Sequence, residues 1–499
     1  MTDGRSPSRR GFLCAVGATA LSGAIISRRG DDGIEADYRT VVDVVEEGAD
    51  PSGEESVSPV VDSLLADDTL LRFPEGRYYM DEQVRHTGFE TVGLVGDDGA
   101  TFVPAPVTDY EGPTYRLFRL GVRDDPGRDL HVENFEIDQR AESTGIRAFE
   151  ASVADGLVVR DVDVAGYHDS GTFGPGLFRI TDSSGSGLVE RFHAPSGAAS
   201  SDTVSTDLWR GPTGILGNLN HGTLRFKDCV LGPYPDNGLY ASEGTGTIVV
   251  DGGTFANSGA GSVRLGAGTC IVDGATVVVD DYAEHFPRQQ GIRIDEADDA
   301  QIRNTTVEMT ASTGRAISLH DVTSAWISNV GVTMGPKPAP AIIVGPETGS
   351  TDIVNSSVTI DADANALRLL GDDPGRVVVE GCRIDGDAIG ETFRHAVRAE
   401  RDRCEFRQVE IDQFNGTRRC ALGLLGADYT VYDCTFRTTG PPLMVYGSDV
   451  WVESTYADAL EAADAMYLDA DADSIRVKDC EILDGIEDDG ATNLLVTGT

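Results

Sequence analysis

The stretch VYDCTF, residues 431–436, places a cysteine between a polar residue and an alternating apolar pattern. Related stretches are FKDCVL at 226–231, VEGCRI at 379–384 and VKDCEI at 477–482. Aligning them reveals one column of residues, directly before the thiol position, that recurs along most of the chain. Its fourteen members are Asn134, Asp161, Arg191, Asp228, Gly252, Gly274, Asn304, Asn329, Asn355, Gly381, Gln408, Asp433, Ser454 and Asp479.

Eleven of these fourteen residues are Asn, Asp or Gly, the types that best tolerate a left-handed backbone. The column therefore predicts a tight bend that returns about every 26 residues. Self-similarity at such a period is typical of a solenoid, in which each repeat is one turn of the chain.

A second column of small residues precedes another apolar strand in each repeat. It comprises Gly145, Gly176, Gly214, Gly238, Ser262, Gly291, Ala316, Ala341, Ala366, Ala396, Ala421, Pro442 and Ala465. The strands that follow it alternate between apolar and polar residues, as in GIRID at 291–295. Short strands with bends at fixed offsets predict an all-β solenoid of about 15 coils with three short parallel sheets.

The position after the bend is predicted to point into the core, where cysteine acts as a small apolar residue. Cys382, Cys434 and Cys480 are two coils apart, which separates them by about 9.6 Å. A disulfide requires Cα atoms within about 7 Å. We therefore expect no disulfide framework, and leave open only whether Cys404 and Cys420 approach one another.

Acidic residues outnumber basic ones by 83 to 40, which gives the chain a net charge of −43. Such self-repulsion suits a brine, because the Debye length falls to about 3 Å at 1 M salt. The composition therefore predicts a halophilic protein. An acidic surface repels phosphates and anionic lipid, so we expect no nucleic-acid partner.

Residues 1–30 contain paired arginines, Arg9 and Arg10, followed by Gly-Phe-Leu and an apolar run that ends near Ile26. This order resembles the twin-arginine export signal. The apolar run is too short to predict a membrane span. The resemblance implies an extracellular or cell-surface location reached by the twin-arginine route.

Residues 38–110 differ in kind from the repeats and are predicted to form an N-terminal cap of a short helix and strands with the first coils. They resemble the start of the pectate lyase-like, right-handed parallel β-helix superfamily. The matching residues are Gly48, Ala49, Asp50, Pro51, Gly53, Phe73, Pro74, Gly76 and Tyr78. The resemblance implies a right-handed β-helix over residues 111–490, in a secreted member of haloarchaeal type. A helix that could close the C-terminal end is not evident, so an oligomer formed through that end is one expectation.

Enzymes of that superfamily bind polysaccharide along one exterior sheet, whereas other members are non-catalytic surface proteins or viral tailspikes. The motifs Asn-Thr-Asp, Gly-His-Gly and Arg-Ile-Lys are missing, which argues against a polygalacturonase. The lyase motif Arg-x-Pro-x-x-Arg is missing as well. The sequence thus predicts binding of an acidic polysaccharide and leaves its cleavage open, with a lyase favoured over a glycosidase. The alternative is a non-catalytic surface or adhesion protein.

A row of outward positions on the strands after the small-residue column carries the candidate binding residues. Its predicted members are Arg147, Phe178, Leu216, Tyr240, Arg264, Arg293, Ser318, Ile343, Arg368, Arg398, Gly423, Met444 and Tyr467. Arg264 and Arg293 fall on neighbouring coils, as do Arg368 and Arg398. Stacked guanidinium groups can clamp the carboxylates or sulfates of a polysaccharide. They can equally form an ion-paired ladder with Asp295 and Glu400, and this second interpretation is favoured.

Two long segments, residues 194–214 and 280–290, flank the coils that carry Tyr240 and Arg264 and predict a walled cleft. They bring Trp209, Tyr282 and His285 to it. Trp209, Tyr234 and Tyr240 suit stacking on sugar rings, or equally the covering of a solenoid edge.

A lyase needs one group to neutralise the uronate carboxylate and another to remove the adjacent proton. Arg264 or Arg293 is the candidate for the first role, and Tyr240, His285 or His320 for the second. A glycosidase would need two carboxylates, for which Asp236 and Asp295 are the nearest pair. We expect no cofactor. Calcium is compatible with the Asp-rich loops, although the chain has no spaced ligand set of the EF-hand type.

Overall fold

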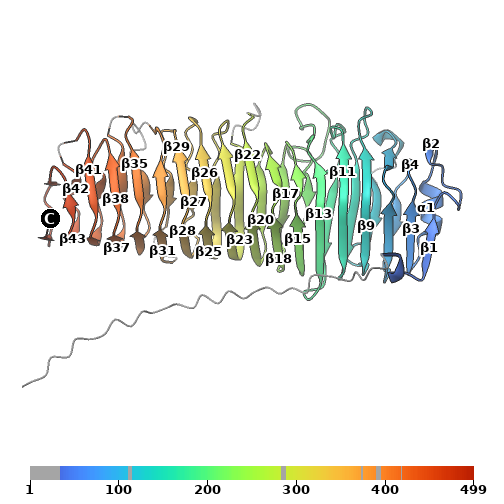
Figure 1. Ribbon diagram of the computed structural model, residues 1–499, viewed down its shortest axis with the longest axis horizontal. Coiled ribbons are helices and arrows are strands. Elements are labelled where there is room, and N and C mark those ends of the chain that lie inside the picture. The colour runs from blue at the N-terminus through green and yellow to red at the C-terminus, as the bar shows by residue number, and fades with distance from the viewer. Residues whose placement is uncertain are drawn as a thin grey trace, which may run out of the picture. The chain divides into compact units, whose positions relative to one another are not determined.

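The structure is a computed structural model that describes residues 34–110, 115–281, 288–371, 375–388, 395–416, 418–462 and 464–498. It divides the chain into two units, residues 1–37 and residues 38–499. In the smaller unit the described residues form the 3₁₀ helix η1 (Ile34–Asp37). The predicted export signal, residues 1–30, lies outside the described residues. The larger unit is a parallel β-solenoid of about 17 turns (Figure 1).

Each turn of the solenoid contributes strands to three faces, which we name sheets A, B and C. In sheet A each strand pairs in parallel with the strand of the next turn. Sheet A contains β1 (Thr40–Asp43), β3 (Thr69–Phe73), β6 (Val92–Gly96), β9 (Leu130–Asp138), β11 (Leu157–Ala165), β13 (Ser186–Ala194), β15 (Thr223–Lys227), β18 (Thr247–Asp251), β21 (Thr269–Asp273), β23 (Gln290–Arg303), β25 (Ile317–Ser328), β28 (Ser350–Val354), β31 (Val377–Glu380), β34 (Cys404–Arg407), β37 (Ala427–Tyr432), β40 (Ser448–Glu453), β43 (Asp473–Lys478) and β46 (Leu495–Thr497).

Sheet B follows sheet A along the chain, and the second halves of β9, β11 and β13 run on into it. Its other strands are β2 (Ser52–Ser56), β4 (Gly76–Met80), β7 (Ala100–Pro104), β16 (Val230–Leu231), β19 (Thr254–Ala256), β22 (Thr276–Val279), β24 (Thr306–Met309), β26 (Gly331–Met334), β29 (Ser357–Ile360), β32 (Arg383–Asp385), β35 (Glu410–Gln413), β38 (Thr435–Thr438), β41 (Tyr456–Ala459) and β44 (Glu481–Ile482).

Sheet C closes each turn, and the first halves of β23 and β25 belong to it. Its other strands are β5 (Val84–His86), β8 (Arg116–Leu120), β10 (Arg147–Val153), β12 (Gly176–Ile180), β14 (Ile215–Leu216), β17 (Asn237–Ser242), β20 (Gly261–Gly266), β27 (Ile342–Val344), β30 (Leu367–Leu369), β33 (His395–Ala399), β36 (Cys420–Leu424), β39 (Leu443–Val445), β42 (Met466–Leu468) and β45 (Ile486–Asp488).

The predicted all-β parallel solenoid is confirmed. The structure has about 17 turns rather than the predicted 15, because the first turns, residues 40–104, lack the bend column that was counted in the sequence.

The bend column lies between sheets A and B, and its backbone is left-handed in each of the fourteen turns that carry it. All fourteen positions have φ between 49° and 71°, including Arg191, Gln408 and Ser454, whose side chains carry no special tolerance for it. The geometry is therefore imposed by the turn, and Asn, Asp and Gly are the residues that adopt it at least cost.

The position after the bend lies in the core, as predicted. The seven described cysteines are all free and buried. Each thiol on this column donates to the carbonyl two residues earlier, as in the 3.4 Å contact from Cys434 Sγ to the oxygen of Tyr432. Ser356 and Thr455 make the same contact with their hydroxyl groups, at 2.9 and 3.1 Å. The recurring cysteine is thus a packing residue with a local hydrogen bond.

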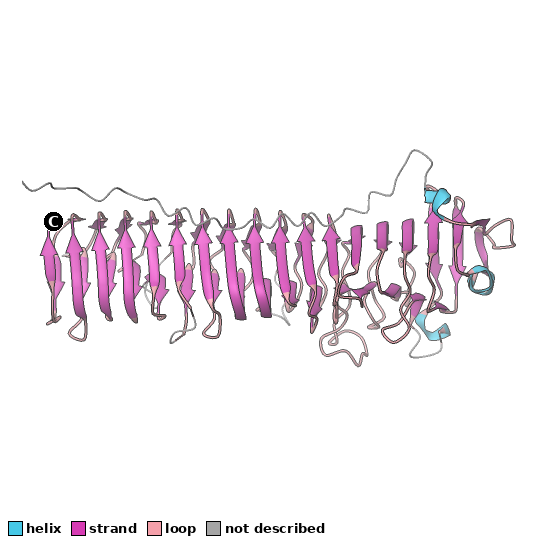
Figure 2. Cartoon of the chain, turned by 90° about the horizontal axis from the view of Figure 1, so that it is seen from below, coloured by secondary structure: helices cyan, strands magenta, loops and turns pink. Residues whose placement is uncertain are grey.

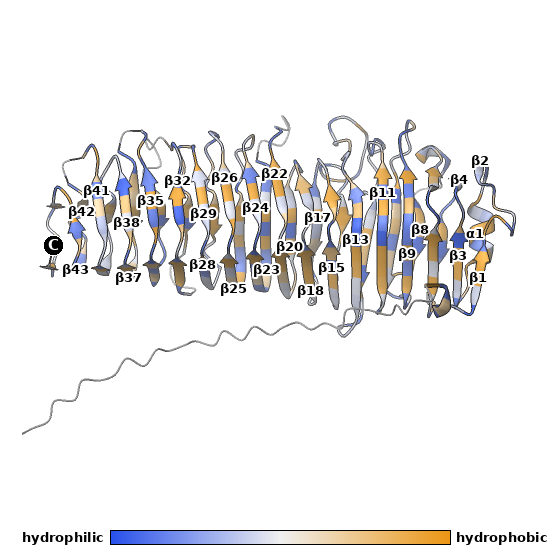
Figure 3. Ribbon diagram, viewed as in Figure 1, coloured by the Kyte–Doolittle hydropathy of each residue, from blue (hydrophilic) through white to orange (hydrophobic). Residues whose placement is uncertain are grey.

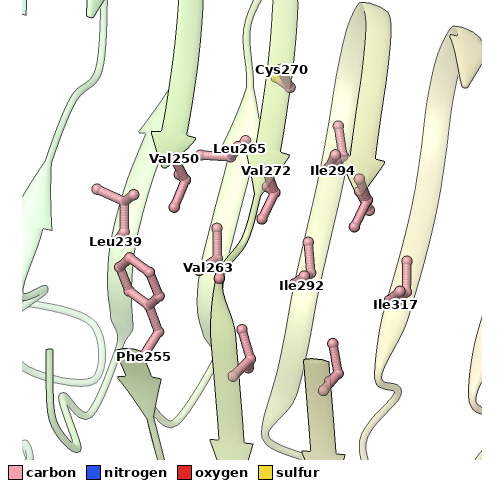
Figure 4. Packing of buried hydrophobic residues seen from close by; sticks show 14 of the residues in the cluster. Leu239, Val250, Phe255, Val263, Leu265, Cys270, Val272, Ile292, Ile294 and Ile317 are labelled. Atoms are coloured by element: carbon pink, nitrogen blue, oxygen red, sulfur yellow. The ribbon is translucent and has the colours of Figure 1, made fainter. Parts of the chain in front are cut away.

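Core side chains stack in ladders from turn to turn. Leu239, Val263, Ile292 and Ile317 occupy equivalent positions on sheet C in successive turns (Figure 4). Apolar and polar residues are interleaved along the strands, as the hydropathy colouring shows (Figure 3). The buried residues are mostly apolar, and most of the exposed ones are polar. The solenoid therefore has an apolar interior and three outer faces.

The N-terminal cap contains the predicted short helix, α1 (Ser58–Leu64), whose Val61 is buried against the first turns (Figure 2). Asp50 shapes the turn before β2 because its carboxylate accepts the backbone N–H groups of Ser52, Glu54 and Glu55. Tyr78 donates its hydroxyl to the carbonyl of Pro74 at 2.7 Å. A second 3₁₀ helix, η2 (Val107–Asp109), follows β7.

Candidate functional site

The outer face of sheet C carries one row of equivalent outward positions. From β14 onward the row matches the prediction, and its members are Leu216, Tyr240, Arg264, Arg293, Ser318, Ile343, Arg368, Arg398, Gly423, Met444 and Tyr467.

The prediction is wrong for the two earlier turns. Arg147 and Phe178 were expected in the row, but both are buried. Glu150 and Leu177 take their places, because Gly176 pairs with Phe149 and is itself a core position in that turn. In these two turns the small residue therefore does not stand at its usual offset from the outward position of the strand.

Arg264 and Arg293 share one carboxylate, that of Asp295. The Nε atoms of Arg264 and Arg293 donate to Asp295 at 3.0 and 2.8 Å. Asp295 is largely buried beneath them, with 16% of its side chain exposed. The ion-paired arrangement expected from the sequence is thus present, but with two guanidinium groups for one carboxylate.

The second predicted pair follows the same scheme. Arg398 Nε lies 2.5 Å and Arg368 Nη2 3.3 Å from the same oxygen of Glu400. Arg368 Nε is buried and has no hydrogen-bond partner. Each arginine pair therefore leaves about one positive charge uncompensated on this face.

A pocket of about 560 Å³ opens at the corner before β23, β25 and β27. We name it the central basic pocket. It is lined by Arg288, Gln290, Thr313, Gly314, Arg315, Pro338, Ala339 and Pro340. Among the described residues neither Arg288 nor Arg315 has a carboxylate partner, so the pocket adds two more positive charges to the face.

Arg315 extends from the pocket along the outside of sheet C. Its Nη1 donates to His320 Nε2 at 3.4 Å, and Ser318 between them is fully buried although it belongs to the outward row. Ser318 donates in turn to the side-chain oxygen of Gln290 at 3.0 Å. Burial, and then the positive charges of Arg293, Arg368 and Arg288, lower the pKa of Arg315.

His320 lies beside Asp295 in register and is half-buried. Burial, and then the charge of Arg293, lower the pKa of His320 below its ordinary value. The imidazole is therefore neutral at pH 7, and Nε2 is the nitrogen that accepts a hydrogen bond. A neutral imidazole beside the guanidinium groups of Arg293 and Arg315 can act as a base toward a bound carboxylate-bearing ligand.

The predicted aromatic residues fall into different settings. Tyr240 faces outward, and the guanidinium of Arg264 stacks 5.0 Å above its ring. Trp209 is 76% exposed and lies under Arg210 at 4.3 Å. Tyr234 is fully buried and cannot stack on a sugar, which corrects its assignment. Its ring fills the space above Gly214, where an added Cβ would lie 2.9 Å from it.

Asp236 accepts a hydrogen bond from Thr213 Oγ1 at 2.9 Å. Asp295 is held by two arginines. One member of the predicted glycosidase pair, Asp295, is therefore fixed in ion pairs, and the other, Asp236, is not. His285 and Tyr282, expected from the loop at 280–290, lie outside the described residues.

The sequence interpretation missed Arg288 and Arg315, the residues that distinguish this pocket. Arg315 stands one residue before the small-residue column at Ala316, whereas the search considered only positions after that column. No group of three or more His, Cys, Asp or Glu side chains suited to a metal ion occurs within the described ranges. That part of the chain also contains no helix with the length and hydropathy needed to cross a bilayer.

No family model matches this sequence, and no curated protein matches it. Solved structures that resemble it include ORF18 of Geobacillus virus E2, with 11% identity over 74% of this chain and a TM-score of 0.36. This chain spans 61% of the length of that protein. The catalytic unit of a GH87 alpha-1,3-glucanase from Streptomyces thermodiastaticus is 11% identical over 91% of this chain and 68% of its own, with a TM-score of 0.36. The surface adhesin PfbA of Streptococcus pneumoniae is 11% identical over 92% of both chains, with a TM-score of 0.37. At this level of similarity, what those proteins bind or cleave says nothing about the ligand of this chain.

Proposed function

We propose that the protein binds an acidic polysaccharide on the outer face of sheet C, at the central basic pocket. The observation that carries this proposal is the pair of arginines there, Arg288 and Arg315, which lack a carboxylate partner among the described residues although the chain has a net charge of −43. In so acidic a chain, unpaired arginines beside an open pocket favour an anionic ligand.

The geometry suits repeated acidic groups rather than one small anion. Arg264 and Arg293 lie on neighbouring strands, about 4.8 Å apart along the solenoid axis. Arg368 lies three strands beyond Arg293 in the same row, about 14 Å away. A chain that carries a carboxylate or sulfate on successive sugars would meet guanidinium groups at several of these steps. Guanidinium groups bind such oxyanions with two parallel hydrogen bonds.

The net charge of the whole chain opposes the approach of any polyanion at low salt. At about 1 M salt the Debye length is only about 3 Å, so that repulsion is screened while contacts inside the pocket remain. This is consistent with our further proposal that the protein is halophilic and works outside the cell, exported by the twin-arginine route. Nucleic acid and membrane remain unexpected as partners.

The test is calorimetric titration with polygalacturonate, alginate, hyaluronan and chondroitin sulfate at a salt concentration that keeps the protein folded. We expect Arg315→Ala to weaken binding of the preferred polymer about 10- to 100-fold, since a hydrogen bond to a charged group contributes about 1.5–3 kcal/mol. Arg293→Ala should weaken it as well. The matched control is Arg398→Ala, which is ion-paired like Arg293 but lies four strands away from it in the row and does not line the central basic pocket, so it should matter less. Equal losses, or none, would remove the central basic pocket from the proposal.

The neutral imidazole of His320 favours a second candidate, cleavage of the bound uronate by β-elimination. An arginine would neutralise the carboxylate, and His320 would take the proton from the adjacent carbon. The electron pair of that C–H bond would form the double bond as the glycosidic bond on the neighbouring carbon breaks, and the departing glycosidic oxygen would take a proton from water. The product carries a carbon–carbon double bond that absorbs in the near ultraviolet. Growth of that absorbance in wild type and its loss in His320→Gln would establish the lyase; binding without it would establish a non-catalytic surface or adhesion protein.

A further inference from the structure

A second group of arginines lies on the outer face of sheet C, toward the N-terminal end, around the single carboxylate of Glu150. Arg147 Nη1 and Arg119 Nε each lie 2.9 Å from a different oxygen of Glu150. Arg116 donates to it as well. Burial alone would raise the pKa of Glu150, but the positive charges of Arg147 and Arg116 lower it to about 2. The carboxylate is therefore ionised at any physiological pH.

Among the described residues of this cluster, positive charge exceeds negative charge. Arg147 is almost completely buried, and its Nη2 has no hydrogen-bond partner. Phe173 lies under the guanidinium groups of Arg147 and Arg116, at 4.8 and 5.0 Å. Stacking on a ring offsets part of the cost of burying the charges, but it supplies no counter-charge.

Arg179 is the fourth guanidinium of the cluster, and it makes no hydrogen bond or salt bridge with any described residue. Its Nε is buried and unpartnered. Arg179 pairs in register with Ser152, two residues beyond Glu150 on β10, and is half-buried. Burial lowers the pKa of Arg179, Glu150 raises it, and the charges of Arg123 and Arg119 lower it again, so this guanidinium lies close to the cluster. Burying a charged donor without a partner costs free energy that a bound anion would recover.

We infer that Glu150, Arg119 and Arg179 form a second anion-binding subsite for the same polymer. The inference rests on the proposed function. From Glu150 in β10 the outward row passes through Leu177, Leu216 and Tyr240 before it reaches Arg264 and Arg293. Five strand-to-strand steps separate Glu150 from Arg293, which makes about 24 Å.

The surface between the two basic regions is apolar and aromatic. Leu177 is buried, but Leu216 and Tyr240 are half-buried and present carbon-rich surface on which the ring faces of sugars can pack. Acidic groups of one extended chain would then be held at both ends of this stretch. The ligand is accordingly an acidic oligosaccharide of at least about 24 Å, not a single sugar acid.

Binding at two linked subsites makes the second contact intramolecular and raises affinity by about 10² to 10⁴-fold once the chain can span both. The experiment titrates wild type, Arg179→Gln and Arg293→Gln with uronate oligosaccharides of increasing defined length, taken from whichever polymer the protein prefers. Arg476→Gln, an exposed arginine on sheet A, serves as the control. Circular dichroism verifies that each variant is folded.

In wild type and in Arg476→Gln, we expect the affinity to rise steeply once the oligosaccharide is long enough to span about 24 Å. Arg179→Gln should abolish that rise and leave the binding of short oligosaccharides unchanged. Arg293→Gln should weaken ligands of every length. If Arg179→Gln leaves long ligands unaffected while Arg293→Gln weakens them, the second subsite is wrong and the proposed function stands. If no oligosaccharide binds, or Arg293→Gln changes nothing, the proposed function itself is wrong.

Discussion

Whether an arginine on sheet C is available to a ligand depends on the side chain with which it interacts. Arg398 and Arg315 both project near the outer face of sheet C. Arg398 is paired with Glu400, whereas Arg315 meets a neutral histidine. Only the second arrangement leaves a guanidinium available to a ligand, and sequence spacing alone does not distinguish the two.

His168 is a buried histidine that links stability to pH. Burial lowers the pKa of His168 from 6.5 to about 4. Above pH 6.5 both folded and unfolded states hold it neutral. Between pH 6.5 and about 4 the unfolded state binds the proton more readily, so the free energy of unfolding falls as pH falls, by on the order of 3 kcal/mol in all.

We therefore expect the wild-type denaturant midpoint to drop between pH 7 and pH 4.5 by more than that of His168→Gln, measured at constant salt. The comparison concerns the slope with pH, so a lower absolute stability of the variant does not obscure it. Parallel pH profiles for the two proteins would show that His168 contributes nothing to the dependence.

At the level of the turns, the bend between sheets A and B was predictable because a positive φ favours Asn, Asp and Gly, and these residues recur in that column. The outer row of sheet C was predictable where the row residue stands two positions after the small residue, as Arg293 does after Gly291. In the two earlier turns the row residues are Glu150, five positions after Gly145, and Leu177, one position after Gly176. Tyr234 was misassigned for a related reason, because the turn residues around it indicate a surface although its ring fills the core.

The bend column also predicts which substitutions stabilise the solenoid. Ser454 has φ of 54° and, unlike Asn, little intrinsic tolerance for that region. Ser454→Asn should raise the free energy of unfolding by about 0.5–1 kcal/mol, as read from the denaturant midpoint.

The control is Ser350→Asn, at an exposed position of the regular strand β28, where asparagine is disfavoured and a small loss is expected. A gain at Ser350 equal to that at Ser454 would mean that the left-handed bend is not the cause.

At the scale of the whole molecule, the sequence repeat predicted the solenoid. The net charge of −43, in contrast, is a property of the whole chain and cannot be assigned to any single turn. Ion pairs such as Arg72 with Asp97 and Lys478 with Glu453 join neighbouring turns, yet 83 acidic residues cannot all find partners among 40 basic ones. The excess acts over distances longer than one turn, since the Debye length is about 10 Å at 0.1 M salt and strands stack about 4.8 Å apart.

This self-repulsion leads to a prediction for the intact chain. Raising sodium chloride from 0.1 to about 2 M should increase the thermal midpoint substantially, because screening removes repulsion among carboxylates on successive turns. Sucrose at equal osmolality is the control, since it strengthens burial through exclusion from the surface without screening charge. A midpoint that rises equally in sucrose, or falls in salt, would mean that the acidic surface is not what limits stability, and the proposal of a halophilic protein would lose its physical basis.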